Sequence, residues 1–219
     1  LDCPPDVPVG IGLAGKLSPA TGTVSLAPNL GWRDVPFGQM LETHFGYPVR
    51  LVNDLSAITV GEVRVGAARG ACDVVCVFVG TGVGMGAVSG GQLVEGARGL
   101  ACELGHVKVE SPAQGRGCGC GERGCLEAYV AGCHLSALYM DYASGIGHEV
   151  PAHEGGLSAG FIDELARRGD LVALAVWQQA TDYLARAIGA TVTLLDPTVV
   201  VLGGGVLMAA PRLTEMLIN

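Results

Sequence analysis

Three cysteines stand within eight positions of the sequence, and glycines separate them. Cys118, Cys120 and Cys125 lie in the segment GCGCGERGC. Zinc is held by about four sulfur or nitrogen ligands in a tetrahedral arrangement, and His106, twelve residues before the first cysteine, completes such a set. The intervening glycines allow the tight turn that this requires. A glycine-rich loop with incidental thiols is the alternative, but the density of cysteine and glycine favours a metal site.

A second group that could do chemistry is the pair Asn53–Asp54 in the segment LVNDLSA. Such a pair before a helix most often caps that helix through its side-chain oxygens. The same junction of strand and helix can also project a carboxylate into a cleft, where it could accept a proton from a substrate hydroxyl. The residues alone leave both interpretations open.

Two glycine-rich segments follow apolar runs that are typical of buried strands. They are GTGVGMG at 80–86 and LGGGV at 202–206. Backbone amides of such a loop can bind phosphate, and Thr81 adds a hydroxyl donor. Residues 82–87 also fit the dinucleotide fingerprint G-x-G-x-x-G/A, which requires a helix directly after the glycines. The following segment is instead typical of a hairpin that turns at Gly90–Gly91, which disfavours that alternative.

The elements that must position these residues alternate between strands and helices. We expect strands at 7–13, 47–54, 73–80 and 197–205, a short strand within 18–32, and helices at 35–46, 55–66, 125–143, 160–169, 171–195 and 210–217. Strands that end in glycine loops, with helices between them, predict an open α/β sheet that carries its ligands at the strand ends.

Composition limits the possible functions. The 219 residues include 35 glycines and carry a formal net charge of −8, so a nucleic-acid partner is not expected for this stretch. No apolar run approaches the roughly 20 residues of a membrane span, and no signal peptide is evident. We therefore expect a cytoplasmic protein, with its cysteines in metal or thiol form. His44, His134, His148 and His153 are expected at the surface.

The segments ELGHV (103–107) and GCGCGERGCLE (117–127) resemble the signature of the ROK family of repressors, open reading frames and kinases. Its form is E-x-G-H, a spacer, and then C-x-C-G-x-x-G-C-x-E. The resemblance implies an α/β, actin-like (ribonuclease H-like) two-domain sugar-kinase fold with a structural zinc loop. Residues 1–53 would be the remainder of the small domain, and residues 54–219 would form the large domain, incomplete at its C-terminus.

The same resemblance implies a role for each residue group. Asp54 would be the general base of a kinase that uses ATP and Mg²⁺ to phosphorylate a hexose, glucose first, at its 6-hydroxyl. The residues implied in sugar binding are Gly15, Asn29, Asn53, Glu103, His106 and Glu127. Those implied in nucleotide binding are Gly80, Thr81, Gly82, Gly84, Gly203, Gly204 and Gly205. Zn²⁺ would be held by His106, Cys118, Cys120 and Cys125. The family also implies a homodimer or homotetramer.

One family motif is missing. Full ROK kinases begin with a phosphate loop of the form D-x-G-G-T, and this chain contains none. We expect that loop before Leu1 and a helical segment after Asn219, which makes the chain a fragment whose own activity is in doubt. The sugar-sensing body of a ROK repressor, with its winged helix before Leu1, is the alternative from another class. An inactive remnant that only binds sugar is a third. Asn53–Asp54 and the two glycine loops favour the kinase.

Overall fold

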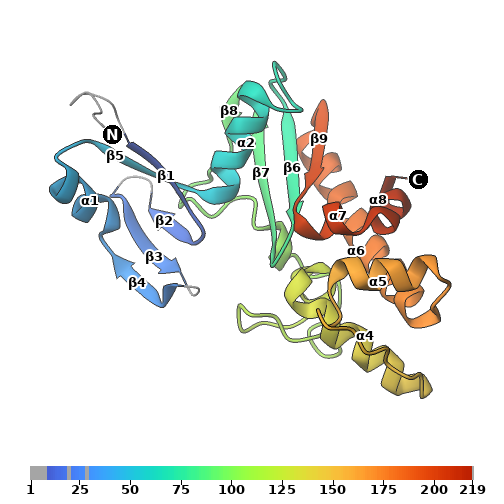
Figure 1. The fold of residues 1–219 in the computed structure, drawn as a ribbon. Helices are drawn as coiled ribbons and strands as arrows, with labels where there is room; N and C mark the ends of the chain where they lie inside the picture. Colours follow the sequence, from blue (N-terminus) through green and yellow to red (C-terminus); the bar gives the residue numbers. More distant parts are fainter. Residues whose placement is uncertain (1–8, 19–20, 28–29, 219) are drawn as a thin grey trace. The chain divides into compact units, whose positions relative to one another are not determined.

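The computed structural model describes residues 9–18, 21–27 and 30–218 (Figure 1). These residues form two compact units. The first unit contains the chain up to Val75 and the segment Gly86–Cys102, and the second contains Cys76–Met85 and the chain from Glu103 onward. The assignment of residues 1–53 and 54–219 to the two domains of a kinase stays a prediction.

The first unit contains two small sheets (Figure 1). Two parallel strands pair in register from Val9 opposite Val49 to Leu13 opposite Asn53. A separate antiparallel sheet has the order β2-β3-β4, where the sequence predicted one short strand. Buried Val24 and Ala27 form its core. The strands are β1 (Val9–Leu13), β2 (Lys16–Ser18), β3 (Thr23–Ala27), β4 (Trp32–Val35) and β5 (Val49–Asn53).

Two helices complete this unit, and both begin and end as the sequence predicted to within two residues. Helix α1 (Phe37–Phe45) ends at Gly46, which has a left-handed φ of 72°. The Gly46 amide donates a hydrogen bond to the Glu42 carbonyl, and this is the expected C-cap. Helix α2 (Asp54–Val65) starts where β5 ends. The parallel strand β5 therefore delivers Asn53 and Asp54 directly to a helix N-terminus.

A four-stranded sheet has the order β8-β7-β6-β9. Strand β6 (Val74–Val79) is buried along almost its whole length, as its continuous apolar sequence predicted. Strand β7 (Val83–Ser89) follows the first glycine-rich segment, and no helix does. The dinucleotide-fingerprint alternative is therefore wrong. Strands β8 (Gln92–Leu93) and β9 (Val199–Gly203) complete the sheet.

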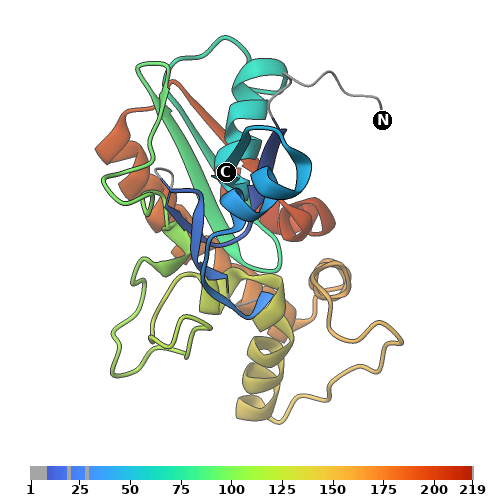
Figure 2. The same ribbon diagram turned by 90° about the vertical axis from the view of Figure 1, so that its left-hand side faces the viewer.

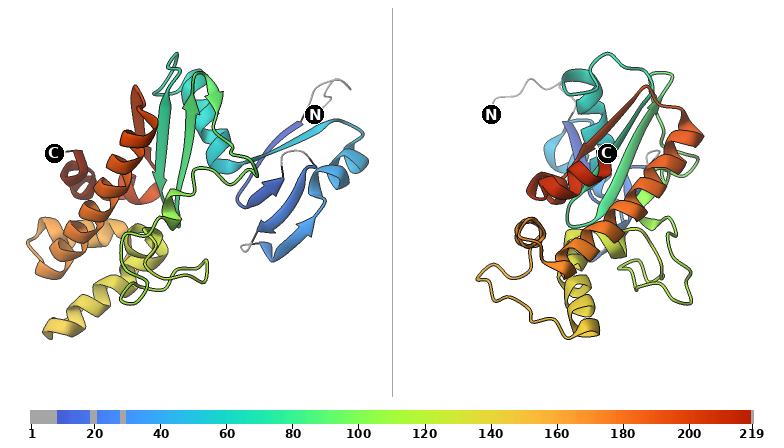
Figure 3. Two further views of the ribbon diagram at one scale, coloured as in Figure 1. Left: turned by 180° about the vertical axis from the view of Figure 1, so that it is seen from behind. Right: turned by 90° about the vertical axis from the view of Figure 1, so that its right-hand side faces the viewer.

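The second unit is mainly helical, and the 25-residue α6 packs against α3, α4, α5 and α8 (Figure 3). Trp177 of α6 is fully buried. Among the described residues no helix, α6 included, has the length and apolar character that crossing a membrane requires. The helices are α3 (Glu127–Val130), α4 (Gly132–Ile146), α5 (Ala159–Arg167), α6 (Leu171–Leu195), α7 (Gly205–Ala209) and α8 (Pro211–Ile218).

The structure corrects two expectations here. The helix predicted over 125–143 is broken at Ala131, which has the extended angles φ −73° and ψ 142°. The break frees the Gly132 amide to donate to the Gly80 carbonyl at 2.8 Å. An irregular loop joins α4 to α5 (Figure 2). His148 in this loop is half-buried and is not a free surface side chain. Its Nε2 lies 2.8 Å from Oδ2 of Asp170, which also caps α6.

Candidate active site and metal centre

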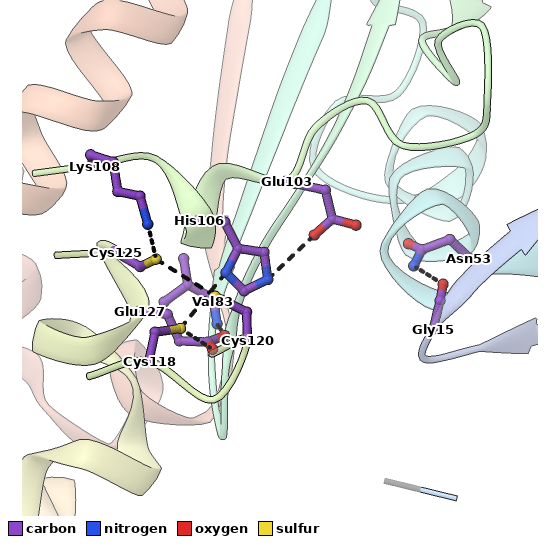
Figure 4. A network of polar contacts seen from close by, with 10 residues as sticks. All are labelled: Gly15, Asn53, Val83, Glu103, His106, Lys108, Cys118, Cys120, Cys125 and Glu127. Carbon is purple, nitrogen blue, oxygen red and sulfur yellow. Dashed lines mark hydrogen bonds and ion pairs between the residues drawn. The ribbon is translucent and has the colours of Figure 1, made fainter. Parts of the chain in front are cut away.

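The four predicted metal ligands come together in the second unit (Figure 4). One ligand atom from each of His106, Cys118, Cys120 and Cys125 lies within 4.8 Å of the others. The Cys120 and Cys125 sulfurs are 3.8 Å apart, and Cys118 Sγ lies 3.8 Å from His106 Nδ1. A tetrahedral ion with Zn–S bonds of about 2.3 Å separates two sulfur ligands by about 3.8 Å. The geometry and the donor set therefore fit zinc.

Left-handed glycines make the sharp turns around these ligands. Gly121 and Gly124 have φ of 90° and 77°, which favour glycine over any other residue. A Cβ on Gly124 would lie 2.2 Å from the Glu110 carbonyl oxygen. An isolated antiparallel bridge pairs Lys108 with Cys125 and brings the segment after His106 alongside the last cysteine.

The thiols differ in their ease of ionisation. Burial raises the pKa of Cys118 to about 12, so metal binding has to displace a proton there. Burial also pushes the pKa of Cys120 upward, but hydrogen bonds from the Glu122 backbone and from the neighbouring thiols outweigh it and lower that pKa. At Cys125 a cation stands close, because Lys108 Nζ donates to Cys125 Sγ at 3.1 Å. The sequence did not predict this lysine.

His106 belongs to the short 3₁₀ turn η2 (Leu104–His106). Its Nδ1 faces the cysteines, while its Nε2 lies 3.8 Å from Oε2 of Glu103 (Figure 4). The ring thus turns one nitrogen to the metal site and the other to a largely exposed carboxylate. This is the orientation that a shared metal and substrate histidine requires. Binding of sugar hydroxyls by Glu103 and His106 stays a prediction.

Glu127, the first residue of α3, links the metal ligands to the first glycine-rich segment. Its Oε2 accepts a hydrogen bond from the Val83 amide at 3.0 Å, and its Oε1 lies 3.5 Å from Cys118 Sγ. The sequence predicted Glu127 as a sugar ligand and gave no sign of the bond to Val83. No local pattern could reveal it, because 44 residues separate the two partners.

The two glycine-rich segments predicted for nucleotide lie next to each other. Both follow strands of the second unit, β6 and β9, and a Cβ on Gly80 would lie 3.9 Å from the Gly205 amide nitrogen. Gly204 has a φ of 98°, and a Cβ there would lie 2.4 Å from the Val79 carbonyl oxygen. The close approach therefore requires glycine. The first segment contributes the predicted residues Gly80, Thr81, Gly82 and Gly84. The second contributes Gly203, Gly204 and Gly205.

In the first unit, Asn53 caps α2. Its Oδ1 accepts hydrogen bonds from the Leu55 and Ser56 amides at 3.0 and 3.2 Å, which confirms the capping interpretation for this residue. Its Nδ2 donates to the Gly15 carbonyl at 3.4 Å, so these two predicted residues lie together. Asp54 is half-buried, and its Oδ1 also accepts from the Leu55 amide. Asn29 lies outside the described residues.

Two hollows of about 480 and 370 Å³ lie elsewhere, along α6, and share Glu110, Gln179 and Tyr183. No predicted site residue lines either of them. The candidate site within the second unit is therefore defined by its side chains and glycine-rich strand ends.

Comparison with known proteins gives a consistent result. The ROK family model matches residues 5–218. A glucokinase of Thermotoga maritima is 36% identical over 203 residues, which cover 90% of this chain and 63% of that protein. A putative xylose repressor of a Caldicellulosiruptor species is 34% identical over 198 residues, covering 89% of this chain and 49% of that protein.

Among solved structures, a ROK family glucokinase from Streptomyces griseus in complex with glucose and AMPPNP is 33% identical. It superposes with a TM-score of 0.75, covering 98% of this chain and 73% of that one. The chain spans 63% and 49% of the lengths of the two curated relatives named above, which is less than two thirds of each. The predicted α/β, actin-like fold class is confirmed by these neighbours. The chain belongs to the ROK family.

Proposed function

We propose that the protein to which this chain belongs phosphorylates a hexose, glucose first, at its 6-hydroxyl, with ATP and Mg²⁺. The observation that carries the proposal is a half-buried carboxylate, Asp54, at the junction of β5 and α2. The names of the Thermotoga maritima and Streptomyces griseus relatives, both glucokinases, support the choice of reaction and sugar. The adjacent glycine-rich strand ends support ATP as the donor.

Each residue group has a physical task in this proposal. Transfer of a phosphoryl group depends on positioning and charge neutralisation more than on covalent chemistry by the protein. Asp54 accepts the proton of the attacking hydroxyl, and Asn53 fixes the start of α2 that presents it. The carboxylates of Glu103 and Glu127 accept hydrogen bonds from sugar hydroxyls. The amides of the two glycine-rich segments contact the nucleotide.

The metal has a structural task. His106 and the three cysteines would hold a tetrahedral zinc ion with all four of its ligands from the protein, so the ion would supply rigidity and no open position for a reacting water. Mg²⁺ bound to ATP would neutralise part of the charge on the phosphates. Assembly as a homodimer or homotetramer in the cytoplasm, and the division into domains at residue 53, belong to the same proposal.

The decisive test is turnover of glucose, mannose, fructose and N-acetylmannosamine with Mg-ATP by the full-length natural protein and its Asp54→Asn variant. The amide keeps the size of the side chain but cannot act as a base, so we expect kcat to fall by about 100-fold or more. Asp182→Asn, an exchange of the same type at an exposed position of α6, should keep full activity.

Two outcomes would contradict the proposal. Undiminished turnover by a folded Asp54→Asn variant would place the base elsewhere. No turnover of any of these sugars by folded, zinc-loaded wild type would exclude the kinase.

The second candidate function is the sugar-sensing body of a repressor, and the similarity to a putative xylose repressor favours it. Such a protein would bind sugar without turnover. Calorimetric titration with glucose and xylose, beside the turnover assay, separates the two functions. Binding with a normal metal content but no phosphorylation would identify a sensor.

A further inference from the structure

The backbone turn between β6 and β7, here called the glycine loop (Gly80–Val83), is in contact with the metal-bearing region on several sides. We propose that the metal centre sets the conformation of the glycine loop, with Glu127 as the positioning residue that transmits it. This goes beyond the expected contact of Glu127 with sugar. Only the last step, from loop conformation to nucleotide binding, rests on the proposed function.

The first step is that the metal ligands place Glu127. Cys125 stands two residues before it, and both Cys125 and Leu126 are fully buried. The Leu126 amide donates to the Val107 carbonyl at 2.9 Å, next to His106. Glu127 Oε1 lies 3.5 Å from Cys118 Sγ. Cys125 before Glu127 in the chain and Cys118 beside its carboxylate therefore restrict the direction of this side chain.

The second step is that Glu127 fixes the glycine loop (Figure 4). The Val83 amide donates to Glu127 Oε2 at 3.0 Å. A Cβ on Gly82 would lie 2.7 Å from that same oxygen, so the carboxylate occupies the space where a side chain would stand. The Gly80 amide closes the turn by donating to the Gly82 carbonyl at 2.9 Å. Charge-assisted bonds of this kind are about twice as strong as neutral ones.

The third step is that two further contacts hold the loop from the same region. A Cβ on Gly105, the neighbour of His106, would lie 2.4 Å from the Val83 carbonyl oxygen. At the break between α3 and α4, the Gly132 amide donates to the Gly80 carbonyl at 2.8 Å. One end of the glycine loop thus approaches the neighbour of His106, and the other end contacts Gly132, which follows α3.

The competing explanation is that strands β6 and β7 alone hold the loop and that Glu127 contacts it incidentally. Hydrogen exchange of the amides at 80–84, measured on the full protein without sugar or nucleotide, separates the two. The variants are Glu127→Gln, which loses the charge, and Glu127→Asp, which keeps the charge but shortens the reach. The control is Glu103→Gln, an identical exchange at a carboxylate that faces His106 from the other side.

We expect both Glu127 variants, and removal of zinc from the wild type by a chelator, to speed exchange at Val83 by about tenfold. Glu103→Gln should leave that rate unchanged. Chelation of the Glu127→Gln variant should speed Val83 exchange little further, because the contact of Val83 with the carboxylate is already lost. Unchanged Val83 exchange in both Glu127 variants, with α6 still protected as proof of folding, would overturn the proposal.

Titration of the sugar-free proteins with AMPPNP tests the last step. Glu127→Gln should bind the nucleotide several-fold more weakly than wild type, and Glu103→Gln should bind as wild type does. Equal binding by Glu127→Gln despite faster loop exchange would overturn the step to nucleotide. If even the wild type binds no AMPPNP, the proposed kinase function fails, while the exchange result still decides whether the metal centre controls the loop.

Discussion

At the scale of single residues, Lys108 is the side chain whose position says most about the metal centre. Its Nζ donates to Cys125 Sγ at 3.1 Å and lies 3.6 Å from Oε2 of Glu122. Three thiolates, a neutral imidazole and one divalent ion leave a single negative charge in the site. An ammonium group at a ligand sulfur offsets that charge, as outer hydrogen-bond donors commonly do in metal sites.

Replacement of Lys108 by methionine should therefore weaken zinc binding by about 10- to 100-fold, because the buried Cys125 thiolate loses its cationic donor. Competition with a chromophoric chelator measures the affinity. Lys16→Met, at the other lysine of the chain, should bind zinc as wild type does. Lys108→Arg should retain most of the affinity. Equal affinity of Lys108→Met and wild type would show that the contact has no influence on the metal.

The sequence could predict the four ligands but not Lys108. Cysteine and glycine spacing alone limits how a short loop can arrange its sulfurs. Lysine in the alternating segment HVKVE looks like a solvent-facing position, and its partner is 17 residues away. The contact depends on the isolated bridge between Lys108 and Cys125, which no local pattern encodes.

At the scale of elements, the loop between α4 and α5 is fastened to the start of α6 through Asp170. This carboxylate accepts hydrogen bonds from the Ala173 amide at 2.8 Å and from the Tyr139 hydroxyl at 3.2 Å, and it pairs with His148. Burial pushes the pKa of Asp170 upward, but these three hydrogen bonds outweigh burial and lower the pKa. Three elements therefore depend on one ionised side chain.

The direction of that shift predicts how stability depends on pH. Because the folded pKa lies below the ordinary value of 3.8, the ionised form stabilises the fold above pH 3.8. That contribution is lost as the pH falls through the lower, folded pKa. Asp170→Asn should cost about 1 kcal/mol in the free energy of unfolding at pH 7.

The difference between Asp170→Asn and wild type should shrink steadily as the pH falls below 3.8. Urea unfolding at a series of pH values measures it, with the exposed Asp182→Asn as the matched control. A difference that does not change with pH would mean that the charge of Asp170 plays no part in stability.

Element boundaries could be predicted where local signals decide them. Gly46 ends α1 as its position predicted, and the apolar run of β6 is a buried strand. The break at Ala131 was not predicted, although Gly132 is a poor helix former within the segment. The break lets the Gly132 amide donate to the Gly80 carbonyl, a partner 52 residues away that no local pattern reveals.

At the scale of the whole molecule, all four metal ligands belong to the second of the two compact units. An ion held by these ligands would join the turn at His106 to the cysteine loop, and structural zinc contributes directly to folding. The antiparallel sheet β2-β3-β4 of the first unit has its own buried core around Val24 and Ala27. The two units should therefore respond differently to loss of the metal.

Removal of zinc should speed hydrogen exchange across residues 103–135 by at least about tenfold and leave β3 unchanged. Peptide-resolved exchange before and after chelation measures this, and restored zinc should restore protection. Equal loss of protection in β3 would show that the ion stabilises the chain as one cooperative unit.

The fold class could be predicted because a specific pattern of cysteines, glycines and acids resembles one family, and the family match confirms it. The chemical role of Asp54 could not be derived in the same way. The same Asn–Asp junction serves as a helix cap in this structure, with Asn53 as the acceptor, whether or not Asp54 also takes a proton. Only turnover measurements separate these roles.

Because Gly82 lies close to the Glu127 carboxylate, the residue types at positions 82 and 127 constrain each other. With Oε2 at 2.7 Å from where a Cβ would stand, a side chain at position 82 requires the Glu127 carboxylate to move away from its present place beside the Val83 amide. In relatives that lack the cysteine ligands and this acid, no carboxylate occupies the space beside position 82, so glycine is not required there. Among relatives that keep both the cysteine ligands and the acid at position 127, we therefore expect glycine to be favoured at position 82.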